Sequence, residues 1–130
     1  MKYWQFMDYY SDAGNNLIEK WYTDELSAEA QADFDATLNI LAGTQCWRGL
    51  KAFRFLSGGR YKGLGEIRFK TSNVHYRPVG FFGPDQSQFT LLVGCKKKGK
   101  VYDPPNAFDL AVNRRSLWHR EIGRIHEHSF

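Results

Sequence analysis

The sequence predicts an α+β fold in which an antiparallel meander sheet packs against helices, in the order β-α-α-β-β-β-α. Three observations lead to this prediction. The first 45 residues contain two segments with apolar side chains at helical spacing. Residues 65–96 instead alternate apolar and polar side chains and are interrupted twice by turn sequences. A proline pair then precedes a last segment with one apolar face, which indicates a closing helix.

The N-terminal part is predicted to form one strand and two helices. Residues 3–9 are rich in aromatic side chains, as strands often are. Apolar side chains at helical spacing then predict a short helix that ends at about residue 22. Ser27 is a suitable N-cap for a second helix, and Gly43 is a suitable stop signal for it.

The meander strands are predicted at residues 65–71, 74–82 and 88–96. Ser72-Asn73 and Gly83-Pro84-Asp85 mark the two turns between them. Pro78 lacks a backbone donor and lies within the middle strand, so we expect a local bulge there. The closing helix is predicted to start at Pro104-Pro105, where a proline at the first helical position loses no hydrogen bond.

Length and composition limit the class of protein. A chain of 130 residues suits one domain, so we predict a single domain over residues 1–130 with a polar, frayed tail from about residue 123 to residue 130. No long apolar run or leader-like segment is present, which predicts a cytoplasmic protein with no membrane contact. Cys46 and Cys95 share no metal-ligand spacing, so we expect two buried, reduced thiols and neither metal nor cofactor.

Charge is divided unevenly along the chain. Residues 1–45 carry two Lys and eight Asp or Glu, a net charge of −6. Residues 46–130 carry sixteen Lys or Arg and six acids, a net charge of +10. An electropositive half attracts phosphates or an acidic protein partner, although a merely solvated basic surface is the simpler alternative.

Cationic residues are predicted to converge on the open face of the meander. Arg68 and Lys70 lie two residues apart and so share one side of a strand, and Arg77 follows on the next strand. The last strand is followed by a cationic run and a tyrosine: Lys96, Lys97, Lys98, Lys100 and Tyr102. This set suits a phosphodiester and its developing charge. His75 is either a proton carrier or an ordinary surface residue of its strand.

Four segments of the chain carry short motifs in a definite order. Leu64-Gly65-Glu66-Ile67-Arg68 is similar to an L-W-E-L-R strand, and His75-Tyr76-Arg77 is similar to a Y-R strand. Residues 91–98 are similar to an apolar strand with G-F-x-K-K, and residues 104–118 are similar to a T-P-x-x-E-I-x-x-A-x-x-R helix. In order and spacing, these segments resemble the phage-derived HigB-like branch of the RelE/ParE superfamily of toxins, over about residues 60–120.

The resemblance implies a RelE-like fold and a toxin of a type II toxin–antitoxin system. Its activity would be that of a metal-independent mRNA endoribonuclease on the ribosome, in which the 2′-OH of the substrate attacks the adjacent phosphate. The implied catalytic residues are Arg68 and Arg77 on the scissile phosphate, Lys96 and Lys98 on the phosphate or the leaving oxygen, and Tyr102 on a base or a proton. Further RNA contacts are expected from Lys70, His75, Lys97 and Lys100.

Partners and alternatives follow from the same resemblance. The implied partners are mRNA on the ribosome and a cognate antitoxin, which would cover the basic sheet face or pack near the helical pair. RelE has a basic residue at the position of Glu66, whereas HigB-like members have an acid there, as this chain does. Two other functions stay open at this point: a ParE-like inhibitor that binds DNA gyrase without chemistry, and a non-toxic phage-encoded accessory protein with the same fold.

Overall fold

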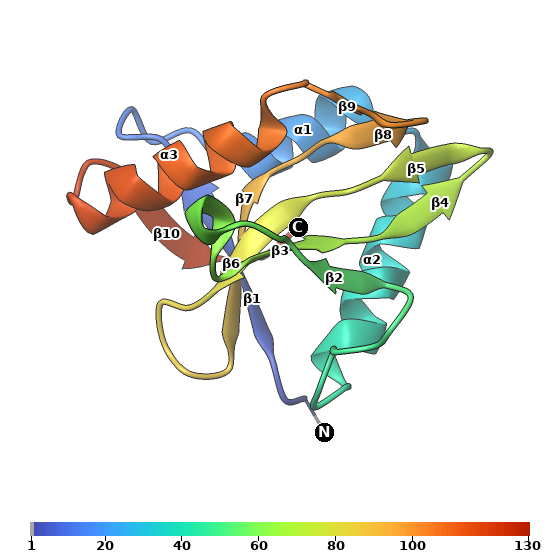
Figure 1. The fold of residues 1–130 in the computed structure, drawn as a ribbon, viewed down its shortest axis with the longest axis horizontal. Helices are drawn as coiled ribbons and strands as arrows, with labels where there is room; N and C mark the ends of the chain where they lie inside the picture. Colours follow the sequence, from blue (N-terminus) through green and yellow to red (C-terminus); the bar gives the residue numbers. More distant parts are fainter. Residues whose placement is uncertain (1) are drawn as a thin grey trace.

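The computed structural model describes residues 2–130 and confirms the predicted α+β class, with helices packed on both mixed and antiparallel sheets (Figure 1). The helices of the described residues are α1 (Leu17–Glu25), α2 (Ala28–Ala42), α3 (Ala107–His119) and a short 3-10 turn, η1 (Gly59–Tyr61). The strands are β1 (Gln5–Tyr10), β2 (Phe53–Phe55), β3 (Leu64–Ile67), β4 (Phe69–Thr71), β5 (Val74–Tyr76), β6 (Val79–Phe82), β7 (Gln88–Val93), β8 (Lys96–Lys98), β9 (Val101–Asp103) and β10 (Arg124–Glu127). They form a six-stranded sheet, β10-β1-β7-β6-β3-β2, and a four-stranded sheet, β4-β5-β8-β9.

The predicted antiparallel meander is present, but each of its strands is divided between the two sheets. The first continues from β3 into β4, the second from β5 into β6, and the third from β7 into β8. The second division falls at Arg77-Pro78, and the pairing register shifts directly after it, between Val79 and Gly80. The bulge expected from Pro78 is thus confirmed, because proline has no N–H to give the ladder. The prediction of three uninterrupted strands is wrong.

The C-terminal tail is ordered, which corrects the prediction that it frays. Its strand β10 pairs antiparallel with β1, and β1 pairs in parallel with β7 on its other side. The backbone N–H of His128 donates to the Phe6 carbonyl at 3.0 Å, and His128 Nδ1 lies 2.8 Å from Oδ1 of Asp8. Asp8 is fully buried, and a buried carboxylate requires a polar partner, so the tail is held in place.

Local capping explains where the helices start. Asn16 caps α1, because its Oδ1 accepts from the backbone N–H groups of Ile18 and Glu19 at 3.0 and 2.9 Å. Ser27 caps α2 by accepting from the N–H of Ala30 at 3.1 Å, as predicted. The last helix begins only at Ala107, so the prolines precede α3 and do not occupy its first position. This corrects the predicted start of the closing helix.

The sheets are covered by α1 and α2 on one face and by α3 on the other (Figure 1). The face toward α1 and α2 holds a core of large aromatic side chains, among them the fully buried Phe34 and Phe89. The face toward α3 holds a second apolar core that includes the buried Cys95. Cys46 is exposed, so the prediction of two buried thiols is correct only for Cys95. No helix among residues 2–130 is long and apolar enough to cross a membrane.

Candidate functional site

The register of the four-stranded sheet gathers several predicted residues into one row. Lys70 lies opposite His75, His75 opposite Lys97, and Lys97 opposite Tyr102. Register partners project from the same face of a sheet, so all four side chains share the face on which α3 lies. Arg68 precedes Lys70 by two residues and Arg77 follows His75 by two, which extends the row to the point where the strands change sheets.

The same alternation places three of the predicted lysines elsewhere. Lys96 is opposite Tyr76 and Asp103, on the reverse face, where its Nζ lies 4.0 Å from Oδ2 of Asp103. Lys98 shares that reverse face, because it lies two residues from Lys96 on β8. Lys100 is exposed in the turn between β8 and β9. The structure therefore does not bring Lys96, Lys98 and Lys100 to the row of Arg68, Arg77 and Tyr102.

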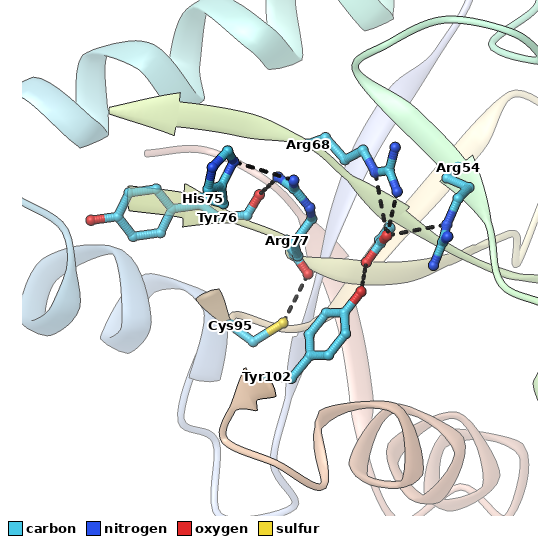
Figure 2. A network of polar contacts seen from close by, with 8 residues as sticks. Arg54, Arg68, His75, Tyr76, Arg77, Cys95 and Tyr102 are labelled. Atoms are coloured by element: carbon cyan, nitrogen blue, oxygen red, sulfur yellow. Dashed lines mark hydrogen bonds and ion pairs between the residues drawn. The ribbon is translucent and has the colours of Figure 1, made fainter. Parts of the chain in front are cut away.

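Glu66 lies at the centre of the polar contacts on this face. Its side chain is fully buried, and its Oε1 accepts from Nη2 and Nε of Arg68 at 3.2 and 3.3 Å. Arg54 Nε lies 3.3 Å from the same oxygen, and the Tyr102 hydroxyl donates to Oε2 at 2.7 Å (Figure 2). A carboxylate can remain charged in a buried position only when it is paired and hydrogen-bonded in this way.

Strand pairing explains how these groups meet. Glu66 on β3 is the register partner of Arg54 on the edge strand β2, and Arg68 follows Glu66 by two residues. The prediction from sequence missed Arg54. Gly58-Gly59 and Gly63 are turn signals, but they do not show which strands pair, and the sequence alone leaves residues 50–56 open between a short strand and a helix. We call the face that carries these side chains the basic face; its residues are Arg54, Glu66, Arg68, Lys70, His75, Arg77, Lys97 and Tyr102.

Arg77 is half-buried and has unused donors. Its Nη1 donates to the Tyr76 carbonyl at 3.0 Å, and its Nη2 lies 3.4 Å from Nδ1 of His75 (Figure 2). Within residues 2–130, no acceptor reaches the buried Nε of Arg77. Burial lowers the pKa of this guanidinium, and the nearby Glu66 carboxylate acts in the opposite direction. Nη1 and Nη2 of Arg77 each keep a second N–H, and these can donate to an anion on this face.

The backbone of Arg77 is fixed by the strand on its other side. Its N–H donates to the Cys95 carbonyl at 2.8 Å, and the Cys95 thiol donates to the Arg77 carbonyl at 2.9 Å. Burial raises the pKa of the Cys95 thiol to about 12, so it stays protonated and able to donate at neutral pH. The thiol therefore positions the Arg77 backbone and is not a nucleophile.

Tyr102 is enclosed on several sides. Its ring centroid lies 4.6 Å from that of Phe108 at the start of α3, and Lys97 Nζ lies 5.3 Å from the Tyr102 ring. Burial and the hydrogen bond to Glu66 both raise the pKa of the phenol, so the hydroxyl remains a donor at neutral pH. Stacking of a base on Tyr102, one of its two predicted roles, would require Lys97 to move away first.

The accessible charge of the basic face is positive. Arg54, Arg68, Lys70, Arg77 and Lys97 are at least partly exposed, whereas the one carboxylate among them, Glu66, is not accessible. The part of the chain that the structure describes contains no cluster of His, Cys, Asp and Glu suited to a metal ion. The face is therefore equipped to bind a polyanion through guanidinium and ammonium groups.

A hollow of about 680 Å³ lies away from the basic face. It is found between the start of β1, the C-terminal half of α2 and the β6–β7 turn. Its wall includes Trp4, Asp35, Gln88 and Phe130, and none of the predicted site residues lines it. We place the candidate site on the basic face, because the groups that suit phosphate chemistry converge there and not in this hollow.

One family model matches the chain. Its description is "Phage derived protein Gp49-like (DUF891)", and the match covers residues 22–116. This region includes every residue of the basic face as well as Lys96, Lys98 and Lys100. No curated protein and no solved structure matches the chain.

Proposed function

Since the chain belongs to the phage-derived Gp49-like family, we propose that it is a ribosome-associated mRNA endoribonuclease, the toxin of a type II toxin–antitoxin system. One observation carries the proposal: five cationic side chains share one face, and the carboxylate among them is buried. The motif resemblance to HigB-like toxins supports the same activity. A phosphodiester is the substrate to which this set of donors is best suited.

The proposed reaction uses the substrate's own nucleophile. The 2′-oxygen forms a bond to the adjacent phosphorus while the bond to the 5′-oxygen breaks, which leaves a 2′,3′-cyclic phosphate and a free 5′-hydroxyl. The proton of the 2′-OH is removed, and the 5′-oxygen gains one. Arg77 and Arg68 would neutralise the additional negative charge on the phosphate in the transition state. His75 lies beside Arg77, with its Nδ1 3.4 Å from Nη2 of Arg77, and we propose that its imidazole carries a proton in this reaction.

The register of β8 changes which lysines we assign to the RNA. Lys97 and Lys70 project from the basic face, so we propose that they contact the phosphate backbone on either side of His75. Lys96 and Lys98 project from the reverse face, and we assign them no role in cleavage. Tyr102 would act through its hydroxyl, which Glu66 holds in one orientation.

The decisive experiment is induction of the protein in cells, followed by mapping of new mRNA 5′ ends beside an assay for gyrase-dependent DNA breaks. We expect mRNA cleavage within translated regions, and we expect purified protein to cleave mRNA only when ribosomes are present. DNA breaks with intact mRNA would replace this proposal with ParE-like inhibition of gyrase. Absence of both effects would leave a non-toxic accessory protein.

We also propose a cognate antitoxin that covers the basic face with an acidic segment. The positive face and the division of charge along the chain support such a partner. Co-purification with the product of the adjacent gene tests this at low and at high salt. Failure of the two proteins to associate even at low salt would contradict it.

A further inference from the structure

We propose that Arg54 forms a second phosphate-binding position on the basic face, which holds the RNA backbone beside the scissile phosphate. This inference rests on the proposed function, because it concerns how the same face binds the same substrate. It adds a binding residue that neither the motif resemblance nor the family match assigns.

The contacts of Arg54 leave its terminal donors free for a ligand. Only its Nε meets Glu66, at 3.3 Å from Oε1, and the side chain is 51% exposed. The two terminal amino groups of a guanidinium form the fork that grips two phosphate oxygens at once. Arg54 therefore combines a fixed position with an accessible bidentate donor.

The other two arginines are more fully occupied. Arg68 gives both Nε and Nη2 to Glu66 and is only 30% exposed. Arg77 directs Nη1 to the Tyr76 carbonyl and Nη2 toward His75. Of the three guanidiniums on the basic face, that of Arg54 has the most donors available without rearrangement.

The buried position of Glu66 makes this arrangement favourable for an anion. Its single negative charge is shared between the guanidiniums of Arg54 and Arg68, so the pair keeps a net positive charge. Because Glu66 is fully buried, a phosphate that approaches Arg54 meets donors and not the carboxylate. The ion pair also fixes the Arg54 side chain before RNA binds, which reduces the entropy lost on binding.

The sheet separates Arg54 from Arg77 and so favours two phosphates over one. Strands β2, β3 and β6 are consecutive neighbours in the six-stranded sheet, and Arg77 lies just before β6, between β5 and β6. Glu66 is the register partner of both Arg54 and Val79, and Arg77 precedes Val79 by two residues. Two strand spacings of about 4.8 Å and two residues of about 3.3 Å along the strand place the backbones of Arg54 and Arg77 about 12 Å apart. A strand of RNA with its scissile phosphate at Arg77 would thus extend across β3 toward the edge strand β2.

Cleavage of modified mRNA on ribosomes tests the inference. A series of mRNAs would carry one neutral methylphosphonate each, at successive positions around the cleavage site. The test variant is Arg54→Gln, because an uncharged amide can still donate to Glu66. The matched control is Arg48→Gln, which removes a guanidinium that lies 4.9 Å from the Phe55 ring and contacts the other surface of β2.

We expect Arg54→Gln to raise KM for the unmodified mRNA about tenfold, with little change in kcat, because a hydrogen-bonded charge is lost outside the reacting centre. We expect a methylphosphonate at one flanking position to raise KM of the wild type by a similar factor. At that position the same methylphosphonate should not raise KM of Arg54→Gln further. Arg48→Gln should retain the full wild-type sensitivity at that position. Equal melting temperatures of the three proteins would show that the fold is unchanged.

The possible outcomes separate this inference from the proposed function. If the wild type cleaves but the effects of Arg54→Gln and methylphosphonate are additive at every flanking position, the second phosphate position does not exist. If the wild type cleaves no mRNA on ribosomes, the proposed function fails, and the inference fails with it. Should Arg54→Gln not fold, Arg54→Lys decides: we expect a reduced methylphosphonate penalty, and an unreduced penalty overturns the inference.

Discussion

On opposite faces of the sheets, two tyrosines each donate a short hydrogen bond to a different carboxylate. Tyr22 on α1 donates to Oδ2 of Asp35 on α2 at 2.8 Å, and Tyr102 on β9 donates to Oε2 of Glu66 on β3 at 2.7 Å. In both pairs, burial and the hydrogen bond raise the pKa of the phenol, with burial as the larger cause. The two bonds are therefore nearly alike in their local chemistry.

The two carboxylates differ in what else they hold. Glu66 is fully buried and also binds Arg68 and Arg54, whereas Asp35 is partly exposed and accepts from the Tyr22 hydroxyl. The Tyr22–Asp35 bond fastens two helices together, but the Tyr102–Glu66 bond belongs to a charged network with accessible cations. A tyrosine–carboxylate bond thus does not identify a site by itself; the cations that share the carboxylate do.

The largest effect is expected for Arg77→Ala, which removes a guanidinium from the basic face and leaves both tyrosine pairs intact. Loss of one donor that stabilises the transition state typically costs about 100-fold to 1,000-fold in rate. We therefore expect mRNA cleavage and growth arrest to disappear. Primer extension on induced cells and a ribosome-dependent cleavage assay measure this loss.

The control for Arg77→Ala is a melting curve, because the neighbouring Pro78 interrupts the strand at this point. The backbone N–H that bonds the Cys95 carbonyl is retained by alanine, so we expect a folded protein. Full toxicity of folded Arg77→Ala would show that Arg77 does not bind the scissile phosphate.

The second prediction contrasts the two carboxylates directly. Removing one partner of a buried ion pair lowers the free energy of unfolding by about 3–5 kcal/mol. Arg54 and Arg68 are partly exposed and can turn toward water, so we expect a smaller loss of about 2–3 kcal/mol for Glu66→Ala. Asp35→Ala loses one hydrogen bond to a partly exposed carboxylate, which is worth about 1.5 kcal/mol. Urea unfolding of both variants gives the comparison, and equal losses would contradict the central position of Glu66.

The third prediction concerns pH and the helical pair. The pKa of Tyr22 is raised to about 12, so its neutral form is favoured in the folded chain. Its contribution to the free energy of unfolding is complete below the unfolded pKa of about 10 and is lost as pH rises toward about 12. We expect Tyr22→Phe to lose less stability than the wild type between pH 9 and about 11.5, because phenylalanine does not titrate.

Urea unfolding at several alkaline pH values measures this difference. Because both proteins share all other tyrosines, the gap between their stabilities isolates Tyr22. Parallel pH curves for the two proteins would show that the Tyr22–Asp35 bond does not influence the titration.

The sequence was informative where short-range chemistry decides the structure. Ser27 and Gly43 predicted the bounds of α2, and turn residues predicted both hairpins of the meander. It was not informative where pairing joins distant segments. Nothing local indicates that β10 adds to β1, or that the buried Asp8 requires His128 from the far end of the chain.

The candidate site shows the same limit. Spacing of two along a strand correctly placed Arg68 and Lys70 on one face. Arg54 was missed because its role depends on the pairing of β2 with β3. Glu66 was recognised as part of the L-W-E-L-R motif, but not as the carboxylate that Arg54 and Arg68 share. The contacts that organise the face are thus long-range ones, which neither propensity nor spacing encodes.

The smallest expected effect compares adjacent lysines on one strand. Lys97 projects beside Tyr102 and His75 on the basic face, whereas Lys98 projects from the reverse face of β8. Both are lysines on the same three-residue strand, so Lys97→Ala and Lys98→Ala change charge and strand propensity equally. An exposed charge contact contributes about 0–1 kcal/mol, so we expect Lys97→Ala to slow cleavage about two- to fivefold and Lys98→Ala to leave it unchanged. Initial rates on programmed ribosomes, at an ionic strength low enough to limit screening, resolve such a difference. If the two variants lose activity equally, the RNA responds to the total charge near the β8–β9 turn and not to the face from which each side chain projects.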